Sequence, residues 1–350
     1  MANNNSRLTS IQILRAFAAV WVVIAHALGL IRHREQLNPA IAMIGGYGWL
    51  GVDVFFIVSG FVIYFTVHGK KITAGTFFAR RAERIVPPYL LLTTALCILM
   101  LALPQFFETF HFSIDHLLRS AAYLSFTRYE YPLLYVGWTL EYEMLFYLLA
   151  SCALACGAFL FTRLTVCLCI LVLFGLAFAH SGYSSKPIIF LTDPILLEFC
   201  LGFLCAALFL TGTINLKVAA VMLFTLVMVY CNNPTHRAIV VGLPSVGLLA
   251  LCLRLERYVS VPRLLRNTLT SIGDASYSIY LIQVFSLPLA DKLQGFFPEA
   301  VGPAAFLVLA TAFTTGLGWI FFRQVERPML ELIRKARVRR SAPLEELRAE

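Results

Sequence analysis

Long apolar runs are the feature that most constrains how this chain can fold. A helix needs roughly 20 mainly apolar residues to cross a bilayer. Ten stretches come near that length, at residues 11–31, 49–67, 87–103, 138–160, 164–180, 193–211, 216–231, 237–253, 273–290 and 301–322. Only 13% of the residues are charged, against about 25% in an ordinary soluble domain. The sequence therefore predicts an all-α integral membrane protein with about ten transmembrane helices and excludes a soluble enzyme.

The distribution of basic residues predicts the orientation of these spans. With the N-terminus in the cytoplasm, 21 of the 28 lysines and arginines fall on the cytoplasmic side and 7 fall outside. Basic residues gather in cytoplasmic loops of membrane proteins, so both termini are predicted to be cytoplasmic. The same rule accounts for the net charge of +9 without a nucleic-acid partner. We predict a transmembrane domain over residues 1–330 and a short charged tail over residues 331–350.

Two segments need separate interpretation. The outer loop at residues 104–137 contains "HFSIDHLLRSAAYLSF", which predicts an amphipathic surface helix. The triplet Ala25-His26-Ala27 resembles a signal-peptide cleavage site after an apolar stretch. Cleavage there would remove the first span and break the charge asymmetry that follows, so a retained span is the favoured interpretation.

Arg15 and His26 stand at the two ends of "RAFAAVWVVIAH" in the first predicted span. Eleven residues turn a helix through about 1100°, so both side chains lie on one face, roughly 16 Å apart along the axis. Ionisable groups inside a span are costly and are functional candidates. The alternative is that Arg15 reaches lipid phosphates and His26 is a satisfied core residue.

Acidic residues in the second and fourth spans are further candidates. Asp53 lies among aromatic residues early in the second span, where packing or pairing near the outer surface is the alternative role. Glu141 and Glu143 open the fourth span. Two positions apart on a helix, their side chains point to different faces, so at most one is expected to face a central site.

Arg80, Arg81 and Arg84 crowd just before Pro87-Pro88, which are predicted to start the third span. Positive-inside anchoring is one explanation of this cluster. The other is a cytoplasmic phosphate clamp, because the planar guanidinium group suits phosphate oxygens.

Taken together, these segments resemble the membrane acyltransferase 3 family. The matching pieces are the basic residue and histidine ten residues apart, G-V-D-x-F-F-x-x-S-G-F at Gly51–Phe61, R-R-x-x-R-I-x-P at Arg80–Pro87, W-[ST]-L-x-x-E-x-x-F-Y at Trp138–Tyr147 with Glu143 at the family glutamate, S-Y-S-I-Y-L at Ser276–Leu281, and E-R-P at Glu326–Pro328. Six motifs in this order are specific, and they span residues 8 to about 330. The opening "NNNSRLTSIQILRAFAA" is similar to the branch that acetylates bacterial exopolysaccharides.

The chain also departs from the family pattern. A histidine commonly follows the Y-S-I-Y-L run, whereas Gln283 stands near that place here, so a role of that histidine is not transferred. A serine often found at the position of Glu141 is absent. Residues 331–350 are too few for the extracytoplasmic esterase-like domain that many members carry.

The resemblance implies a multi-pass protein of the bacterial inner membrane that moves an acetyl group from acetyl-CoA to a hydroxyl of an exopolysaccharide or its lipid-linked sugar precursor. His26 is then the expected catalytic residue, as a general base or a transient acyl carrier. Asp53 or Glu143 is expected to orient its imidazole. Arg15 is expected to bind CoA or stabilise developing charge, while Arg80, Arg81 and Arg84 hold the CoA phosphates.

Two other functions stay open at this point. A transporter or flippase of a lipid-linked glycan would also need intramembrane charges, although the sequence lacks the repeat symmetry common in such proteins. A non-catalytic partner of a polysaccharide synthesis complex is the second. No metal site is predicted, because the histidines are scattered and His111, Asp115 and His116 fit the outer surface helix.

Overall fold

The fold is all-helical in the residues that the computed structural model describes, which are 8–31, 37–70, 72–106, 113–156, 160–179, 185–212, 242–256, 261–294 and 302–349. The α-helices are α1 (Thr9–Gly29), α2 (Pro39–Gly46), α3 (Leu50–Val67), α4 (Ala74–Ala102), α5 (Ile114–Ala121), α6 (Trp138–Ala155), α7 (Leu160–Ala179), α8 (Lys186–Leu191), α9 (Leu196–Leu210), α12 (Gly242–Leu255), α13 (Arg263–Asp274), α14 (Ser276–Gln294), α15 (Pro303–Phe321) and α16 (Arg327–Ala349). Short turns of 3-10 helix lie at Pro104–Phe106, Ser125–Thr127 and Tyr135–Gly137, and a π-helical turn at Phe322–Glu326 joins α15 to α16.

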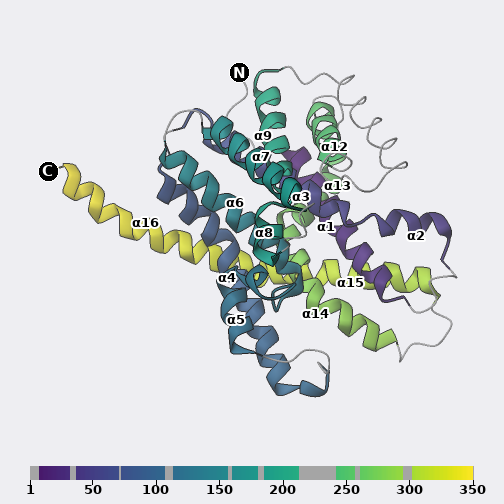
Figure 1. The fold of residues 1–350 in the computed structure, drawn as a ribbon. Coiled ribbons are helices and arrows are strands. Elements are labelled where there is room, and N and C mark those ends of the chain that lie inside the picture. Colours follow the sequence, from purple (N-terminus) through teal and green to yellow (C-terminus); the bar gives the residue numbers. More distant parts are fainter. Residues whose placement is uncertain are drawn as a thin grey trace.

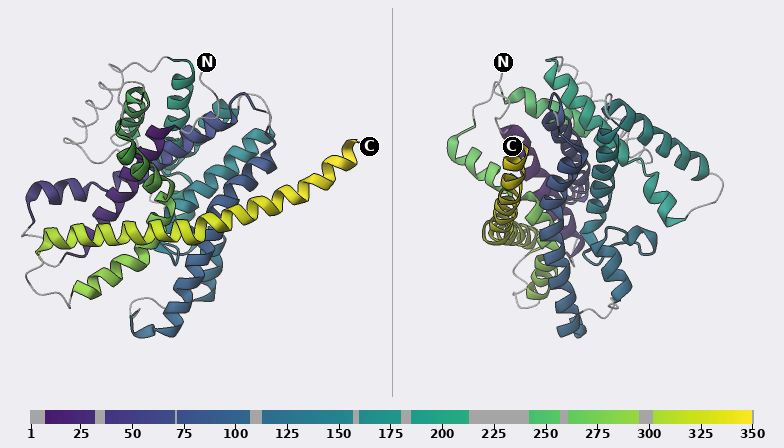
Figure 2. Two further views of the ribbon diagram at one scale, coloured as in Figure 1. Left: turned by 180° about the vertical axis from the view of Figure 1, so that it is seen from behind. Right: turned by 90° about the vertical axis from the view of Figure 1, so that its left-hand side faces the viewer.

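Helix α1 is the centre of the bundle. It packs against α2, α3, α12, α13, α14 and α15, so the first apolar run touches both the early and the late part of the chain. Figure 1 shows α1 among these helices, and α15 with α16 forms a long rod that extends beyond the other helices. The rod is seen from behind in the left view of Figure 2.

The most extensive helix contact joins α3 to α9, and glycines make it possible. A Cβ atom on Gly60 would lie 2.2 Å from the carbonyl oxygen of Phe199, and one on Gly202 would lie 2.2 Å from that of Ile57. Small residues allow this close backbone approach between membrane helices. The two helices run in the same direction, as expected for the second and sixth spans, because Phe56 contacts Phe199 while Phe65 contacts Phe209 further along both helices.

The late helices also follow the expected alternation. Ser286 and Thr314 share a hydrogen bond of 2.8 Å, and Gly318 lies against Ile279. Helices α14 and α15 are therefore antiparallel, as predicted for the ninth and tenth spans.

Helix α4 corrects the predicted start of the third span. The helix begins at Ala74, not at the proline pair, and continues through Pro87-Pro88 to Ala102. A proline inside a helix removes a backbone hydrogen bond, and neighbouring helices can compensate in membrane proteins. The carbonyls that lose their N–H partners here are those of Glu83 and Arg84, four residues before each proline. Next to them, the Tyr277 hydroxyl of α14 donates to the carbonyl of Ile85 (2.8 Å) and ties this part of α4 to α14. The arginine cluster therefore lies on a rigid helix, where the sequence suggested a loop.

Other boundaries differ in smaller ways. The predicted ninth span is divided at Ala275 into α13 and α14, and the sixth is preceded by the short helix α8. The predicted amphipathic surface helix is confirmed as α5 (Ile114–Ala121), while its position on the outer side stays a prediction. The predicted span at 216–231 lies outside the described residues, and that at 237–253 is described only from Gly242 as α12. Within the predicted tail, residues 331–349 continue α16.

Within the described residues, five segments are long and apolar enough to cross a membrane: Thr9–Gly29, Pro39–Val67, Ala74–Ala102, Lys186–Leu210 and Pro303–Arg337. Two shorter apolar helices lie at Phe161–Gly175 and Ser245–Leu255. These segments support a membrane protein, while the number of ten spans and the cytoplasmic position of both termini stay predictions.

We predict that Gly60→Val lowers the free energy of unfolding by about 1–3 kcal/mol, the usual cost of overpacking. The reason is that the new side chain meets backbone atoms of α9. The measurement is the free energy of unfolding in detergent. Gly75→Ala is the matched control, since a Cβ there meets nothing within 4 Å. Equal stability of the two variants would contradict the close α3–α9 contact.

Candidate functional site

A cavity of about 90 Å³ lies where α1, α3, α4, α6 and α14 meet. Its lining residues are Arg15, Val52, Phe55, Phe56, Val58, Ser59, Val62, Arg81, Arg84, Ile85, Thr139, Leu140, Glu143, Tyr147, Ser276, Tyr277 and Tyr280. Four of the seven predicted site residues meet here, namely Arg15, Arg81, Arg84 and Glu143. They come from three helices, so the site exists only in the folded bundle.

Glu143 is held by hydroxyl groups on two helices. Ser59 of α3 donates to its Oε1 (2.9 Å), and Tyr147, one turn later on α6, donates to the same oxygen. Hydrogen bonds to a charged acceptor are stronger than neutral ones. The carboxylate is therefore fixed in the cavity wall and accepts hydrogen bonds from both sides.

The arginines are fixed by different contacts. Arg15 donates to the Ser276 hydroxyl of α14 (2.8 Å). Arg81 donates to Thr66 (3.1 Å), and its guanidinium carbon lies 5.6 Å and 5.7 Å from the ring centres of Phe77 and Tyr147. Such cation–π contacts stabilise the position of a desolvated guanidinium group. The Arg81 side chain is therefore pre-oriented before any ligand arrives.

The cavity is cationic because its lining combines three arginines with one glutamate. Arg81 and Arg84 share the cavity side of α4, three residues apart, and Arg84 is also exposed at the surface. Arg80 is exposed and does not line the cavity. The helical form of this segment thus separates the three predicted clamp residues into two that face the cavity and one that does not.

His26 lies on the same face of α1 as Arg15, as predicted, since both contact α14. Its Nδ1 is 3.0 Å from Oε1 of Gln283, and Nε2 of Gln283 donates to the carbonyl of Tyr280 (2.9 Å). Because the NH₂ group of Gln283 donates to the Tyr280 carbonyl, its amide oxygen is the atom that faces His26. An amide oxygen only accepts, so Nδ1 carries the proton, and Nε2 of the neutral ring is the nitrogen that can accept one.

His26 does not line the cavity, but it is linked to a residue that does. Tyr280 lines the cavity, its hydroxyl donates to the carbonyl of Val136 (3.0 Å), and its own carbonyl accepts from Gln283, the partner of His26. The ring of Tyr135 meets the His26 ring edge-on, with centroids 5.7 Å apart. The site therefore has two parts along one side of α1, a cationic cavity and His26 with its contacts.

Asp53 is completely buried in α3 but does not line the cavity. Gln283, and not Asp53 or Glu143, is the hydrogen-bond partner that the structure gives to His26 Nδ1. The sequence singled out Gln283 only as a departure from the family pattern. Its contact with His26 could not be inferred because the two residues are 257 positions apart.

Glu141 has a different function from its neighbour Glu143. It is buried, and its Oε1 accepts a hydrogen bond from the backbone N–H of Ser125 (2.7 Å) in the outer loop. The expectation that at most one of the two glutamates faces the central site is confirmed. Glu141 instead fastens the loop that leads to Tyr135 beside His26.

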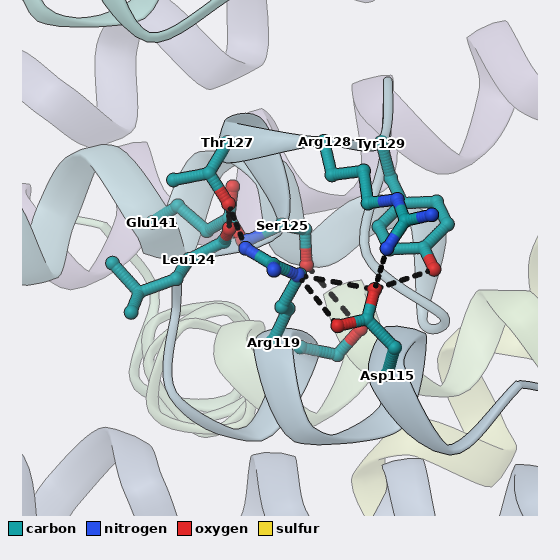
Figure 3. A network of polar contacts seen from close by, with 9 residues as sticks. Asp115, Arg119, Leu124, Ser125, Thr127, Arg128, Tyr129 and Glu141 are labelled. Carbon is teal, nitrogen blue, oxygen red and sulfur yellow. Dashed lines mark hydrogen bonds and ion pairs between the residues drawn. The ribbon is translucent and has the colours of Figure 1, made fainter.

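A surface network organises the same loop (Figure 3). Asp115 accepts hydrogen bonds from Arg119 Nε (2.9 Å), Arg128 Nη1 (3.2 Å) and the Tyr129 hydroxyl (2.8 Å). The Tyr129 hydrogen bond, followed by those of the arginines, lowers the pKa of Asp115 below its ordinary value. His116 stacks on Tyr129 with ring centres 3.9 Å apart, and His111 lies outside the described residues.

The C-terminal segment is tied to the site from the other end. Glu326, of the E-R-P motif, is buried and accepts a hydrogen bond from Ser278 of α14. Arg337 of α16 forms an ion pair with Glu83 of α4 (2.5 Å). Both contacts attach the long C-terminal rod to the helices that carry Ser276 and Arg84.

Comparisons with known proteins agree with this arrangement. The family model described as an acyltransferase domain matches residues 8–323, which include every residue that lines the cavity. The exopolysaccharide production protein ExoZ of Rhizobium meliloti (strain 1021) is 30% identical over 315 residues, covering 84% of this chain and 92% of that relative. No solved structure matches the chain significantly.

We predict that Asp115→Asn loosens the outer loop at neutral pH. The pKa of Asp115 is lowered in the folded state, so its carboxylate stabilises the folded loop at pH values above the pKa of an unfolded aspartate, about 3.9. This stabilisation is lost as the pH falls through the pKa of the folded state. Hydrogen-exchange protection of residues 113–134 should therefore be lower in the variant at pH 7, with the difference shrinking below about pH 4. Glu130→Gln, the same charge change at an exposed position, should leave protection unchanged.

Proposed function

Because this chain belongs to the acyltransferase 3 family and is an acyltransferase, we propose that it moves an acetyl group from acetyl-CoA to a hydroxyl of a bacterial exopolysaccharide or its lipid-linked sugar precursor. The observation that carries the proposal is the cationic cavity that Arg15 lines, with His26 on the same α14-facing side of α1. The name of the relative from Rhizobium meliloti supports exopolysaccharide as the acceptor class. The bacterial inner membrane is the location that this chemistry requires, with the donor on the cytoplasmic side.

The donor side of the proposal rests on the arginines. The CoA phosphates are anionic, and Arg81 and Arg84 present two guanidinium groups from adjacent turns of one rigid helix. At about 90 Å³ the cavity is smaller than typical ligand pockets of roughly 300–1,000 Å³. Binding therefore has to widen it, and movement of Tyr280 would open the cavity towards His26.

The chemical step is assigned to His26. As a general base, Nε2 takes the proton from the sugar hydroxyl while the hydroxyl oxygen attacks the thioester carbonyl carbon. The tetrahedral intermediate then collapses, the C–S bond breaks, and the CoA thiolate leaves and takes up a proton. As an acyl carrier, Nε2 would itself attack the thioester and later pass the acetyl group to the hydroxyl. Both routes need an unprotonated Nε2, which the hydrogen bond of Gln283 to Nδ1 supports.

The remaining site residues have supporting roles in this proposal. Arg15 shares the cavity with Arg81 and Arg84 and lies on the same face of α1 as His26, so it can bind the CoA or stabilise the negative charge on the thioester oxygen. Glu143 holds Ser59 and Tyr147 and balances part of the arginine charge. Asp53, buried outside the cavity, would act on His26 only through other groups.

The test is transfer of label by the purified protein. Reconstituted protein is incubated with acetyl-labelled CoA and an unacetylated exopolysaccharide or its lipid-linked precursor. Label on the glycan supports the proposal. Translocation of the lipid-linked glycan without label would instead indicate a transporter. If neither label transfer nor translocation occurs with any of these acceptors, both the enzyme and the transporter hypotheses are contradicted.

We predict that His26→Ala lowers transfer by at least about 10²–10⁴-fold, the usual contribution of a general base. The measurement is the rate of labelled glycan formation by protein whose insertion and thermal stability match those of the unaltered protein. His68→Ala is the control, because His68 is exposed after the end of α3. Mass spectrometry of the unaltered protein after incubation with acetyl-CoA alone distinguishes the general-base route from the acyl-carrier route. Acetylated His26 appears only if His26 carries the acyl group. Normal transfer by His26→Ala would remove it from the chemistry.

We predict that Arg81→Ala combined with Arg84→Ala raises the KM for acetyl-CoA by roughly tenfold or more, because each lost charged hydrogen bond costs about 1.5–3 kcal/mol. The KM for the glycan should change little. Arg80→Ala is the matched control, with the same charge change on the exposed side of α4. Equal effects of Arg80→Ala and the double variant would reduce the cluster to membrane anchoring.

A further inference from the structure

A second hollow, of about 850 Å³, lies between α1, α13 and α15. Its walls are mainly apolar, and they include Val20 and Ile24 of α1 and Leu307, Val308 and Ala312 of α15. Its volume is within the range of ligand pockets. These α1 residues lie on a different side of the helix from Arg15 and His26, so the hollow is separate from the proposed catalytic site.

The hollow has the length and the openness that a hydrocarbon chain needs. Its α15 wall extends from Leu307 to Trp319, about 18 Å along the helix axis, against roughly 15 Å for one leaflet of the hydrocarbon core. Gly316 lies in this wall, and a Cβ there would meet nothing within 4 Å. The segment Pro303–Arg337 is also the least buried of the five candidate spans, at 28%. The α15 wall therefore faces the bilayer.

One end of the hollow is polar and basic. Trp319 donates from its indole N–H to Ser271 of α13 (2.8 Å), and the guanidinium carbon of Arg323 lies 4.9 Å from the centre of its ring. Asn267 of α13 also lines the hollow, and Arg263 precedes it by one helical turn on the exposed part of α13. Tryptophan and arginine typically mark the level of lipid headgroups. The positive charge of Arg323 at the Trp319 end favours an anionic group.

We infer that this hollow is a binding site for a membrane phospholipid with an anionic headgroup. The hydrocarbon chain lies along α15 over Gly316, and the headgroup phosphate lies beside Arg323 and Arg263. The charge at one end and the apolar walls along the rest match the two parts of such a lipid. The site belongs to the leaflet in which α15 ends, which is the cytoplasmic leaflet in the predicted orientation.

The bound lipid would support the arrangement of α1, α13 and α15 that leads to the catalytic cavity. Gly273 of α13 packs so closely on α1 that a Cβ there would lie 1.9 Å from the carbonyl oxygen of Gln12. Ser276, three residues later, holds Arg15. A lipid that fills the space between these helices therefore stabilises the contact that positions Arg15.

The experiment uses the full chain in vesicles with Trp319 as the only tryptophan, after Trp21, Trp49 and Trp138 are changed to phenylalanine. Chain-brominated phosphatidylglycerol or phosphatidylcholine replaces part of the lipid, and quenching of Trp319 fluorescence is followed. A bound anionic lipid makes quenching by brominated phosphatidylglycerol saturate at a low mole fraction. Quenching by brominated phosphatidylcholine should rise in proportion to its share of the bilayer.

Three substitutions test the parts of the site. Gly316→Leu fills the hollow and should remove the saturating component, and Ala312→Leu does so from one turn away if the first variant does not insert. Gly29→Leu is the matched control, since Gly29 also lies in open space but outside the hollow. Arg263→Gln with Arg323→Gln should remove the preference for phosphatidylglycerol.

Three results would overturn the inference. These are proportional quenching by both lipids in the unaltered protein, unchanged saturation in both leucine variants, or a dimer cross-linked through Ala312→Cys that displaces lipid from the hollow. None of these outcomes depends on acyl transfer, so the inference can fail while the proposed function stands, and the reverse.

Discussion

The contact between α1 and α14 is the interaction on which the rest of this structure depends. It places Arg15 against Ser276 and His26 against Gln283 on one line of side chains. An arginine inside a membrane protein is costly unless polar groups receive it. The helices around α1 therefore have to supply such groups while excluding lipid, and α3, α13, α14 and α15 all pack against α1. The bundle is arranged around one helix whose polar face needs to be enclosed.

Two neighbouring acidic residues show how helix geometry divides structural and chemical roles. Glu143 faces the cavity and accepts from Ser59 and Tyr147, while Glu141 turns outward to the N–H of Ser125. The outer loop that Glu141 fastens carries Tyr135 to the ring of His26. One turn of α6 therefore contributes both to the cavity wall and to the loop that places Tyr135 beside His26. Neither glutamate could replace the other.

Rigid helices, and not loops, present the basic groups of the site. The continuation of α4 through Pro87-Pro88 gives Arg81 and Arg84 fixed positions, and the Tyr277 hydroxyl supports the backbone at Ile85. The ion pair of Glu83 with Arg337 attaches α16 to the same part of α4. Arg15 and Arg81 are thus held in place before a ligand arrives, which lowers the cost of ordering their side chains on binding.

The sequence by itself determined the membrane class and the common face of Arg15 and His26, because hydropathy and the 3.6-residue period are local properties. Motif order was enough to indicate the family. The sequence could not decide that Gln283 contacts His26, that Arg81 lines the cavity while Arg80 does not, or that the proline pair lies inside α4. Those facts depend on contacts between residues up to 257 positions apart and on the tertiary support of a helix that its own sequence would interrupt. Only the packed bundle decides them, because a side chain's partner is set by which helices meet.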